Sequence, residues 1–313
     1  MTVHITSVGV SILDHLQAPR TVGPVGPVAS GIAVGLPRGL IEEWRRLPDR
    51  GRAFRDAAQA AITGTDDPYR LKDLATRAAT ELWPSQISAE TDSLSRSGGA
   101  QRHHLGTDGV GNLVVLIASD TAPGVTAAFW VAAAITAGNL ESITWVDDLG
   151  RLNAVTPRRP TVLVIPIKGM DVGSHAGFKD AMGHLGGLLN TLLQAWTGPT
   201  DPVEFHLSGG YKATVAYLLA MAEWTRTASS HQRRVTAWIL HEESDGRIAV
   251  PLRRIPRATD ELKDIRALNT PSTTPPRGKD LEGYAYEKNQ RGLWVRTAFG
   301  EGLVRVLPAR PGD

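Results

Sequence analysis

The chain has 313 residues, no cysteine, and 34 lysines and arginines against 32 aspartates and glutamates, so its formal net charge is +2. This length is enough to bury a large core, as one large domain or one domain with a small appendage. The absence of cysteine excludes a disulfide framework, a thiolate nucleophile and a cysteine-based metal site, and it fits a reducing compartment. Because the charge is nearly balanced, an anion site must be a local pocket and not a general basic surface.

Membrane insertion and secretion are not expected either. No uninterrupted apolar run approaches the ~20 residues that are needed to span a bilayer. The N-terminal sequence MTVHITSVGV lacks the basic segment and long apolar segment of a signal peptide. We therefore expect a cytoplasmic protein that does not bind a membrane.

Short apolar runs, each typical of a buried β-strand, recur along the chain. They are VHITSVGV (3–10), NLVVLIAS (112–119), LESITWV (140–146), TVLVIPI (161–167), VEFHLS (203–208) and VTAWILH (235–241). Apolar residues at helical spacing occupy 124–137, 174–197 and 209–227 between them. This alternation predicts an α/β fold with a doubly wound, Rossmann-like parallel sheet. RIAVPL (247–252) is typical of a last short strand, which we expect to be antiparallel.

Two segments interrupt the alternation. Residues 18–38 are rich in Pro, Gly and Val, and amphipathic helical patterns follow them at 39–63 and 68–82, so we predict a helical insertion over about 18–100. The second segment, 256–313, is predicted to be a small α+β appendage to a domain that spans 1–255. Its expected parts are a helix at DELKDIRALN (260–269), a Pro/Thr-rich linker (269–280), a hairpin around 289–292 and a short helix.

The most informative motif is FHLSGGYKATVAYLL (205–219), in which a strand leads directly into a helix through Ser208-Gly209-Gly210-Tyr211-Lys212. Glycines allow the backbone to approach a ligand closely, and a helix N-terminus beside a lysine favours a phosphate. The motif is not a Walker A loop, because Ala213 follows the lysine, and it is not the G-x-G-x-x-G fingerprint. The alternative is a tight turn whose glycines serve packing alone.

Two further turns follow predicted strands, and ligands of doubly wound sheets bind at the carboxyl ends of strands. Gly9, Val10 and Ser11 follow the first strand, and the alternative role of Ser11 is to cap the next helix. Asp120 and Thr121 follow the second strand. We expect Asp120 to cap the next helix, and the alternative is a hydrogen bond to a ribose hydroxyl.

Five segments, which occur in the same order as in a known family, carry a resemblance to that family. They are SVGVSIL (7–13), ISAETDSL (87–94), LIASDTAPG (116–124), FHLSGGYKA (205–213) and ILHEESDGRIAVPLRRIP (239–256). Together they resemble the CARF domain (CRISPR-associated Rossmann fold) of type III CRISPR proteins. The resemblance covers about 1–255, with 18–80 poorly matched. The family has a Ser or Thr turn after the first strand and a late [Asn]-x-[Ser/Thr]-Gly-Gly-x-Lys turn. His206 stands here where the family usually has Asn.

The resemblance implies a homodimer that binds a cyclic oligoadenylate, cyclic tetra- or hexa-adenylate, across its two-fold axis. The implied ligand contacts are Gly9, Val10, Ser11, Asp120, Thr121, His206, Ser208, Gly209, Gly210, Tyr211 and Lys212. Some family members are ring nucleases, which implies cleavage by 2′-OH attack without metal or cofactor. Lys212 would then stabilise charge and Ser11 would orient the reacting groups. His206 would assist as an acid or base, or be a buried structural histidine.

The C-terminal segment leaves other functions open. The Arg-x4–6-His signature of HEPN nucleases is matched at Arg226 with His231 and at Arg234 with His241, inside the predicted sensor, which indicates coincidence. The hairpin and last helix resemble part of a winged-helix domain, which would make the protein a DNA-binding regulator. The basic residues suited to phosphate contact are Arg277, Lys279, Lys288, Arg291 and Arg296. A small RelE-like ribonuclease is a third interpretation, and a cap that stabilises the dimer is the one we favour.

Overall fold

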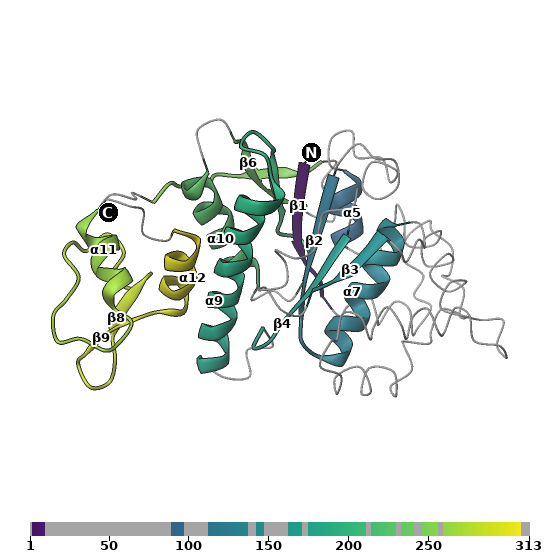
Figure 1. The fold of residues 1–313 in the computed structure, drawn as a ribbon. Helices are drawn as coiled ribbons and strands as arrows, with labels where there is room; N and C mark the ends of the chain where they lie inside the picture. The colour runs from purple at the N-terminus through teal and green to yellow at the C-terminus, as the bar shows by residue number, and fades with distance from the viewer. Residues whose placement is uncertain are drawn as a thin grey trace.

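A seven-stranded sheet forms the centre of the molecule (Figure 1). The computed structural model describes residues 2–9, 89–96, 112–136, 142–146, 162–170, 175–210, 214–229, 233–240, 246–255 and 259–307. The strands are β1 (Thr2–Ser7), β2 (Asn112–Ser119), β3 (Ile143–Trp145), β4 (Val162–Ile167), β5 (Val203–His206), β6 (Val235–Ile239) and β7 (Ile248–Val250). All pair in parallel except β7, which is antiparallel to β6. The predicted α/β class and each predicted strand are confirmed.

The order of the strands gives the sheet a topological switch point. It runs β3-β4-β2-β1-β5-β6-β7, so β1 lies between β2 and β5. The chain builds one half of the sheet from β2 to β4 and the other half from β5 to β7. The carboxyl ends of β1 and β5 therefore flank the position where sheets of this class bind ligands.

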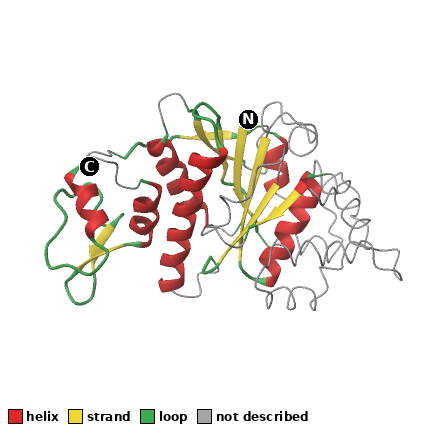
Figure 2. Ribbon diagram, in the orientation of Figure 1, coloured by secondary structure: helices red, strands yellow, loops and turns green. Residues whose placement is uncertain are grey.

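Helices cover both faces of the sheet (Figure 2). One layer contains α5 (Ala89–Ser95), which packs on β1 and β5, and α7 (Ala122–Ile135), which packs on β2 and β4. The other contains α9 (His175–Thr191), which continues as the π-helical turn η2 (Leu192–Trp196), and α10 (Thr214–Ala228). No helix among the described residues is both long enough and apolar enough to cross a membrane. The predicted helical patterns at 39–63 and 68–82 lie outside the described residues.

The C-terminal module consists of α11 (Asp260–Ala267), the hairpin of β8 (Tyr286–Lys288) and β9 (Trp294–Arg296), and α12 (Ala298–Val306). The predicted helix, hairpin and last helix of this segment are thus confirmed. α12 packs against α9 and α10. Its buried residues Leu303 and Val306 belong to the same hydrophobic core as Val3 and Ile5 of β1. One continuous core therefore extends from the sheet through α9 and α10 into the module.

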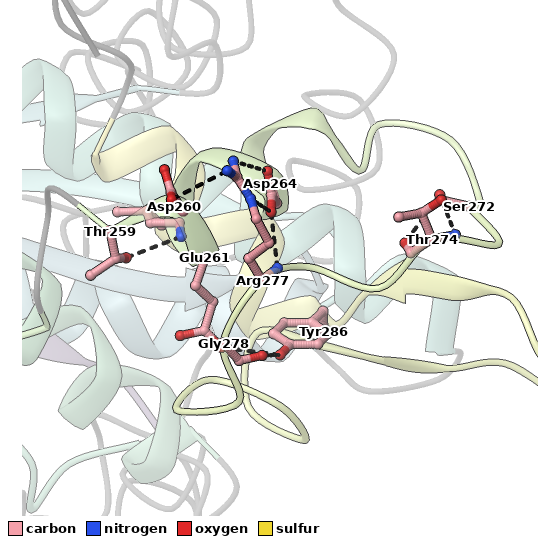
Figure 3. Close-up of polar contacts among 10 residues, drawn as sticks. Thr259, Asp260, Glu261, Asp264, Ser272, Thr274, Arg277, Gly278 and Tyr286 are labelled. Atoms are coloured by element: carbon pink, nitrogen blue, oxygen red, sulfur yellow. Dashed lines mark hydrogen bonds and ion pairs between the residues drawn. The ribbon is translucent and has the colours of Figure 1, made fainter.

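The Pro/Thr-rich segment expected as a linker is bound to this module. Ser272 and Trp294 exchange two backbone hydrogen bonds, of 3.0 and 2.7 Å. The backbone N–H and the guanidinium of Arg277 both donate to the Asp264 carboxylate of α11, at 2.8–3.0 Å, as Figure 3 shows. The Tyr286 hydroxyl lies 3.0 Å from Glu261 Oε1, and its burial there raises the pKa of Tyr286. The segment is thus fixed to α11 and β9 along its length.

Glycines allow α9 and α12 to pack closely. A Cβ atom on Gly186 of α9 would lie 2.3 Å from the carbonyl oxygen of Gly302 in α12. A Cβ atom on Gly302 would lie 2.6 Å from the Trp224 ring. Because backbone atoms cannot rotate away, this contact requires glycine at position 186.

We expect Gly186→Ala to lower the free energy of unfolding by about 1–3 kcal/mol, because the clash outweighs the gain in helix propensity of about 1 kcal/mol. Gly183→Ala in the same helix is the matched control. Its Cβ would meet only the mobile end of Arg305, at 3.0 Å, so we expect no loss. Urea unfolding of both variants measures the difference, and equal midpoints would contradict the packing of α12 on α9.

Candidate functional site

Two turns meet at the carboxyl ends of β1 and β5, and we call them the switch-point turns: residues 7–9 and 207–210. The Ser7 hydroxyl donates to the carbonyl oxygen of Gly209 at 2.9 Å. It also lies 3.0 Å from the hydroxyl of Thr214, the first residue of α10. The turn after β1 is therefore joined both to the turn after β5 and to the start of the following helix.

A carboxylate from α5 links the same two turns. Oε1 of Glu90 accepts the backbone N–H of Gly9 at 2.8 Å and that of Gly210 at 2.9 Å. Glu90 is only 2% exposed, so the bridge is buried. These N–H groups are part of the backbone that the sequence analysis offered to a phosphate, and they already bind an anion of the protein itself. Sequence reasoning missed this role, although the segment 87–94 was singled out for its family resemblance.

The glycines of the switch-point turns are explained by contacts within the protein. A Cβ atom on Gly209 would lie 2.4 Å from Cγ of Glu90, and one on Gly9 would lie 3.1 Å from the backbone of Gly210. Gly210 has φ +89°, and its Cβ would lie 2.2 Å from the Ser7 hydroxyl. Packing therefore accounts for glycine at positions 209 and 210, which was the alternative to a ligand role for this turn, and it leaves little room for a side chain at position 9.

The remaining predicted site residues differ in their placement. Ser208 accepts the backbone N–H of Leu240, at the end of β6. Thr121, not Asp120, is the N-cap of α7, and its hydroxyl accepts the Gly124 N–H at 3.2 Å, so the expectation that Asp120 caps this helix is wrong. The physical reason is that the residue three positions after Asp120 is Pro123, which has no N–H to donate to a cap, whereas Gly124 lies three positions after Thr121. Val10, Ser11, Tyr211 and Lys212 lie outside the described residues.

His206 lies under α5, in the interior of one face of the sheet. Its Nδ1 is 2.8 Å from the Ser93 hydroxyl of α5, and its Nε2 is 3.2 Å from Nδ1 of His4 in β1. The side chain is fully buried. Both ring nitrogens are thus engaged by protein groups, as a structural histidine requires.

Charged residues surround this histidine pair. Oε2 of Glu204 lies 3.8 Å from Nδ1 of His4 and 3.2 Å from the guanidinium of Arg247. That guanidinium also stacks on the Trp238 ring, 4.3 Å from its centroid. Neither His4 nor Glu204 was a predicted site residue. The strand period of two could have found Glu204, because it places Glu204 on the same face as His206. His4 lies on another strand, and only the register of β1 with β5 brings it to this face.

Both histidines are held neutral. Burial lowers the pKa of His4 from 6.5 to about 4, and the nearby Glu204 carboxylate only partly opposes this effect. Burial also lowers the pKa of His206 well below its usual value, and His4 and Arg247 add to the shift. Among the described residues, the ligand atoms of His4, Glu204 and His206 form the one such group within 4.8 Å of one another. Two neutral imidazoles and a carboxylate are suitable ligands for a divalent transition metal.

Fold and site together define the class of this protein: an α/β protein with a Rossmann-like, mostly parallel sheet and two joined turns at its switch point. Comparison with protein-family models finds no match, and no curated protein matches the chain.

The Glu90 bridge predicts that Glu90→Ala destabilises the protein by about 2–4 kcal/mol, because two buried N–H groups lose a charged acceptor. Glu90→Gln keeps an acceptor oxygen at the same position, so we expect a smaller loss. Urea unfolding gives both values, and hydrogen exchange should be faster in peptides that contain Gly9 or Gly210. Wild-type stability and exchange in Glu90→Ala would show that the bridge does not form.

The histidine pair predicts acid sensitivity. The unfolded chain binds a proton at His4 near pH 6.5, whereas the folded protein does so only near pH 4. The free energy of unfolding should therefore fall as the pH is lowered through this range, by about 3 kcal/mol from His4, with no contribution above about pH 7.

Urea unfolding at pH 7, 6, 5 and 4, in EDTA, tests this dependence. His4→Asn should lose less stability between pH 7 and pH 4 than the wild type does. His184→Asn, at an exposed position of α9, is the control and should follow the wild type. Equal losses in the wild type and His4→Asn would contradict the prediction.

Proposed function

We propose that this protein binds a cyclic oligoadenylate, cyclic tetra- or hexa-adenylate, across the axis of a homodimer in type III CRISPR antiviral signalling, and that it cleaves this ring. The observation that carries the proposal is the contact between the two switch-point turns. Ligands of doubly wound sheets bind at this position. Two of the five segments that carry the resemblance to CARF domains contain these turns, which continue in sequence to Ser11 and Lys212.

The Glu90 bridge determines which groups remain for the phosphates. Because Glu90 occupies the N–H groups of Gly9 and Gly210, a phosphate must be bound by the residues that follow them. Ser11 offers a hydroxyl and Lys212 offers an ammonium group. In a two-fold dimer each group is present twice around a symmetric ring, so a chain with a net charge of +2 provides a local cationic site.

The proposed cleavage is an internal transfer. The ribose 2′-oxygen attacks the neighbouring phosphorus, the bond from phosphorus to the 5′-oxygen breaks, and the 2′-proton is finally carried by the departing 5′-oxygen. The products are a 2′,3′-cyclic phosphate and a 5′-hydroxyl. The protein holds the 2′-oxygen in line through Ser11 and stabilises the charge that develops on the phosphoryl group through Lys212.

The alternative is a sensor without catalysis that controls DNA binding or RNA cleavage by the C-terminal module. Three basic residues assigned to such a surface have partners within the module. Arg277 pairs with Asp264 at 2.8 Å, and Arg296 pairs with Glu301 at 3.3 Å. Lys288 lies 4.9 Å from the centre of the Trp294 ring. Because α12 is also packed on α9, we favour the role of a cap for this module.

Chromatography of cyclic tetra- and hexa-adenylate after incubation with the protein in EDTA tests the proposal. We expect linear products with 2′,3′-cyclic phosphate ends. Lys212→Ala should slow cleavage about 10²–10³-fold, because a charge-stabilising group is lost, and Ser11→Ala should also slow it. Lys263→Ala, at an exposed position of α11, is the matched control and should leave the rate unchanged.

Binding measured in parallel separates the two parts of the proposal. Tight binding of an intact ring would overturn cleavage and leave the sensor. If neither ring binds to the full-length protein, the proposed function as a whole is wrong.

A further inference from the structure

We infer that His4, Glu204 and His206 form a binding site for a first-row divalent transition metal ion, with Zn²⁺ as the expected ion. The site lies on the face of the sheet that α5 covers, between β1 and β5. It is separate from the switch-point turns and does not depend on whether the protein cleaves a cyclic nucleotide.

Two of the three separations between the ligand atoms are close to those of a tetrahedral ion, and all three atoms lie within 4.8 Å of one another. Nδ1 of His4 lies 3.2 Å from Nε2 of His206 and 3.8 Å from Oε2 of Glu204. With bonds of about 2.0–2.1 Å, the ligand atoms of tetrahedral zinc lie about 3.3 Å apart. The first distance fits this value within about 0.1 Å, and the second needs a shift of about 0.5 Å. The backbone already supports this arrangement, because His4 pairs with Glu204 in the register of β1 and β5.

A neighbouring hydroxyl orients one of these ligands. The Ser93 hydroxyl lies 2.8 Å from Nδ1 of His206. When Nδ1–H donates to this oxygen, the lone pair of Nε2 is directed at His4. Metal-binding histidines usually have such a partner on the nitrogen that does not bind the metal.

The protonation of the pair is compatible with a metal. In the hydrogen-bonded pair, one of the two facing nitrogens carries a proton. With a metal between the rings, both facing nitrogens use their lone pairs, and the proton of His4 then lies on Nε2. This nitrogen is buried without a hydrogen-bond partner among the described residues, with or without the metal. The bound ion replaces one weak contact by two metal–ligand bonds.

Arg247 competes with the ion, because it donates to Oε2, the same carboxylate oxygen that the metal would use. This provides a test that a purely structural cluster would not pass. Removing the guanidinium frees the oxygen and removes a positive charge, so Arg247→Met should bind the metal more tightly than the wild type does.

Titration of the EDTA-stripped full-length protein with ZnCl₂, followed by calorimetry and elemental analysis, tests the site. We expect one zinc ion per chain. His4→Asn and Glu204→Gln should lower the affinity at least 100-fold, and Ser93→Ala about 10–100-fold. His184→Asn, at an exposed position, should bind as the wild type does. Cobalt added in place of zinc should give the visible absorption of a tetrahedral complex, and this absorption should be lost in His4→Asn.

Glu204→Gln keeps the shape of the side chain. If His4→Asn fails to fold, the zinc affinity of Glu204→Gln therefore tests the site. Absence of bound zinc in the titrated wild type would overturn the inference. So would zinc that binds Glu204→Gln and His4→Asn with wild-type affinity, because that ion would occupy other residues.

Discussion

One carboxylate oxygen satisfies the backbone of both halves of the sheet where they meet. The N–H groups of Gly9 and Gly210 are buried at the ends of β1 and β5, and each needs an acceptor. Glu90 Oε1 accepts both. This bridge fixes α5 over β1 and β5. Little space is left between Glu90, Ser7 and the turn after β5, so residues 209 and 210 are glycines. The burial of Ser93 and His206 follows in turn, because Ser93 lies on the buried side of this helix and His206 lies beneath it.

The two faces of β1 and β5 differ in character. The face toward α9 and α10 is apolar, and it carries Val3, Ile5 and Phe205. The face toward α5 carries His4, Glu204 and His206. Buried polar groups between a sheet and a helix lower the free energy of unfolding unless they are paired with one another or bind an ion. The hydrogen bonds and ion pairs of this cluster provide that pairing, and the proposed metal site would complete it.

Sequence patterns predicted the parallel sheet and most of its helices, because apolar runs of strand length and helical periodicity are local signals. They did not identify α5, a helix of 7 residues (Ala89–Ser95) within the predicted insertion, because it is short and half polar. The insertion therefore supplies Glu90 to the centre of the site. His206 was predicted without its partners. They come from a strand about 200 residues earlier and from α5, and the register of β1 with β5 and the packing of α5 bring them together.

The close contact between α9 and α12 has a consequence for how this protein can evolve. Gly186 belongs to the doubly wound domain and Gly302 to the last helix, yet neither position tolerates a side chain while the other helix is in place. The module from α11 to α12 is thus not a freely exchangeable unit that recombination could replace with an unrelated one. Any replacement would have to present an equally flat helix face to α9, or be accompanied by substitutions along that helix.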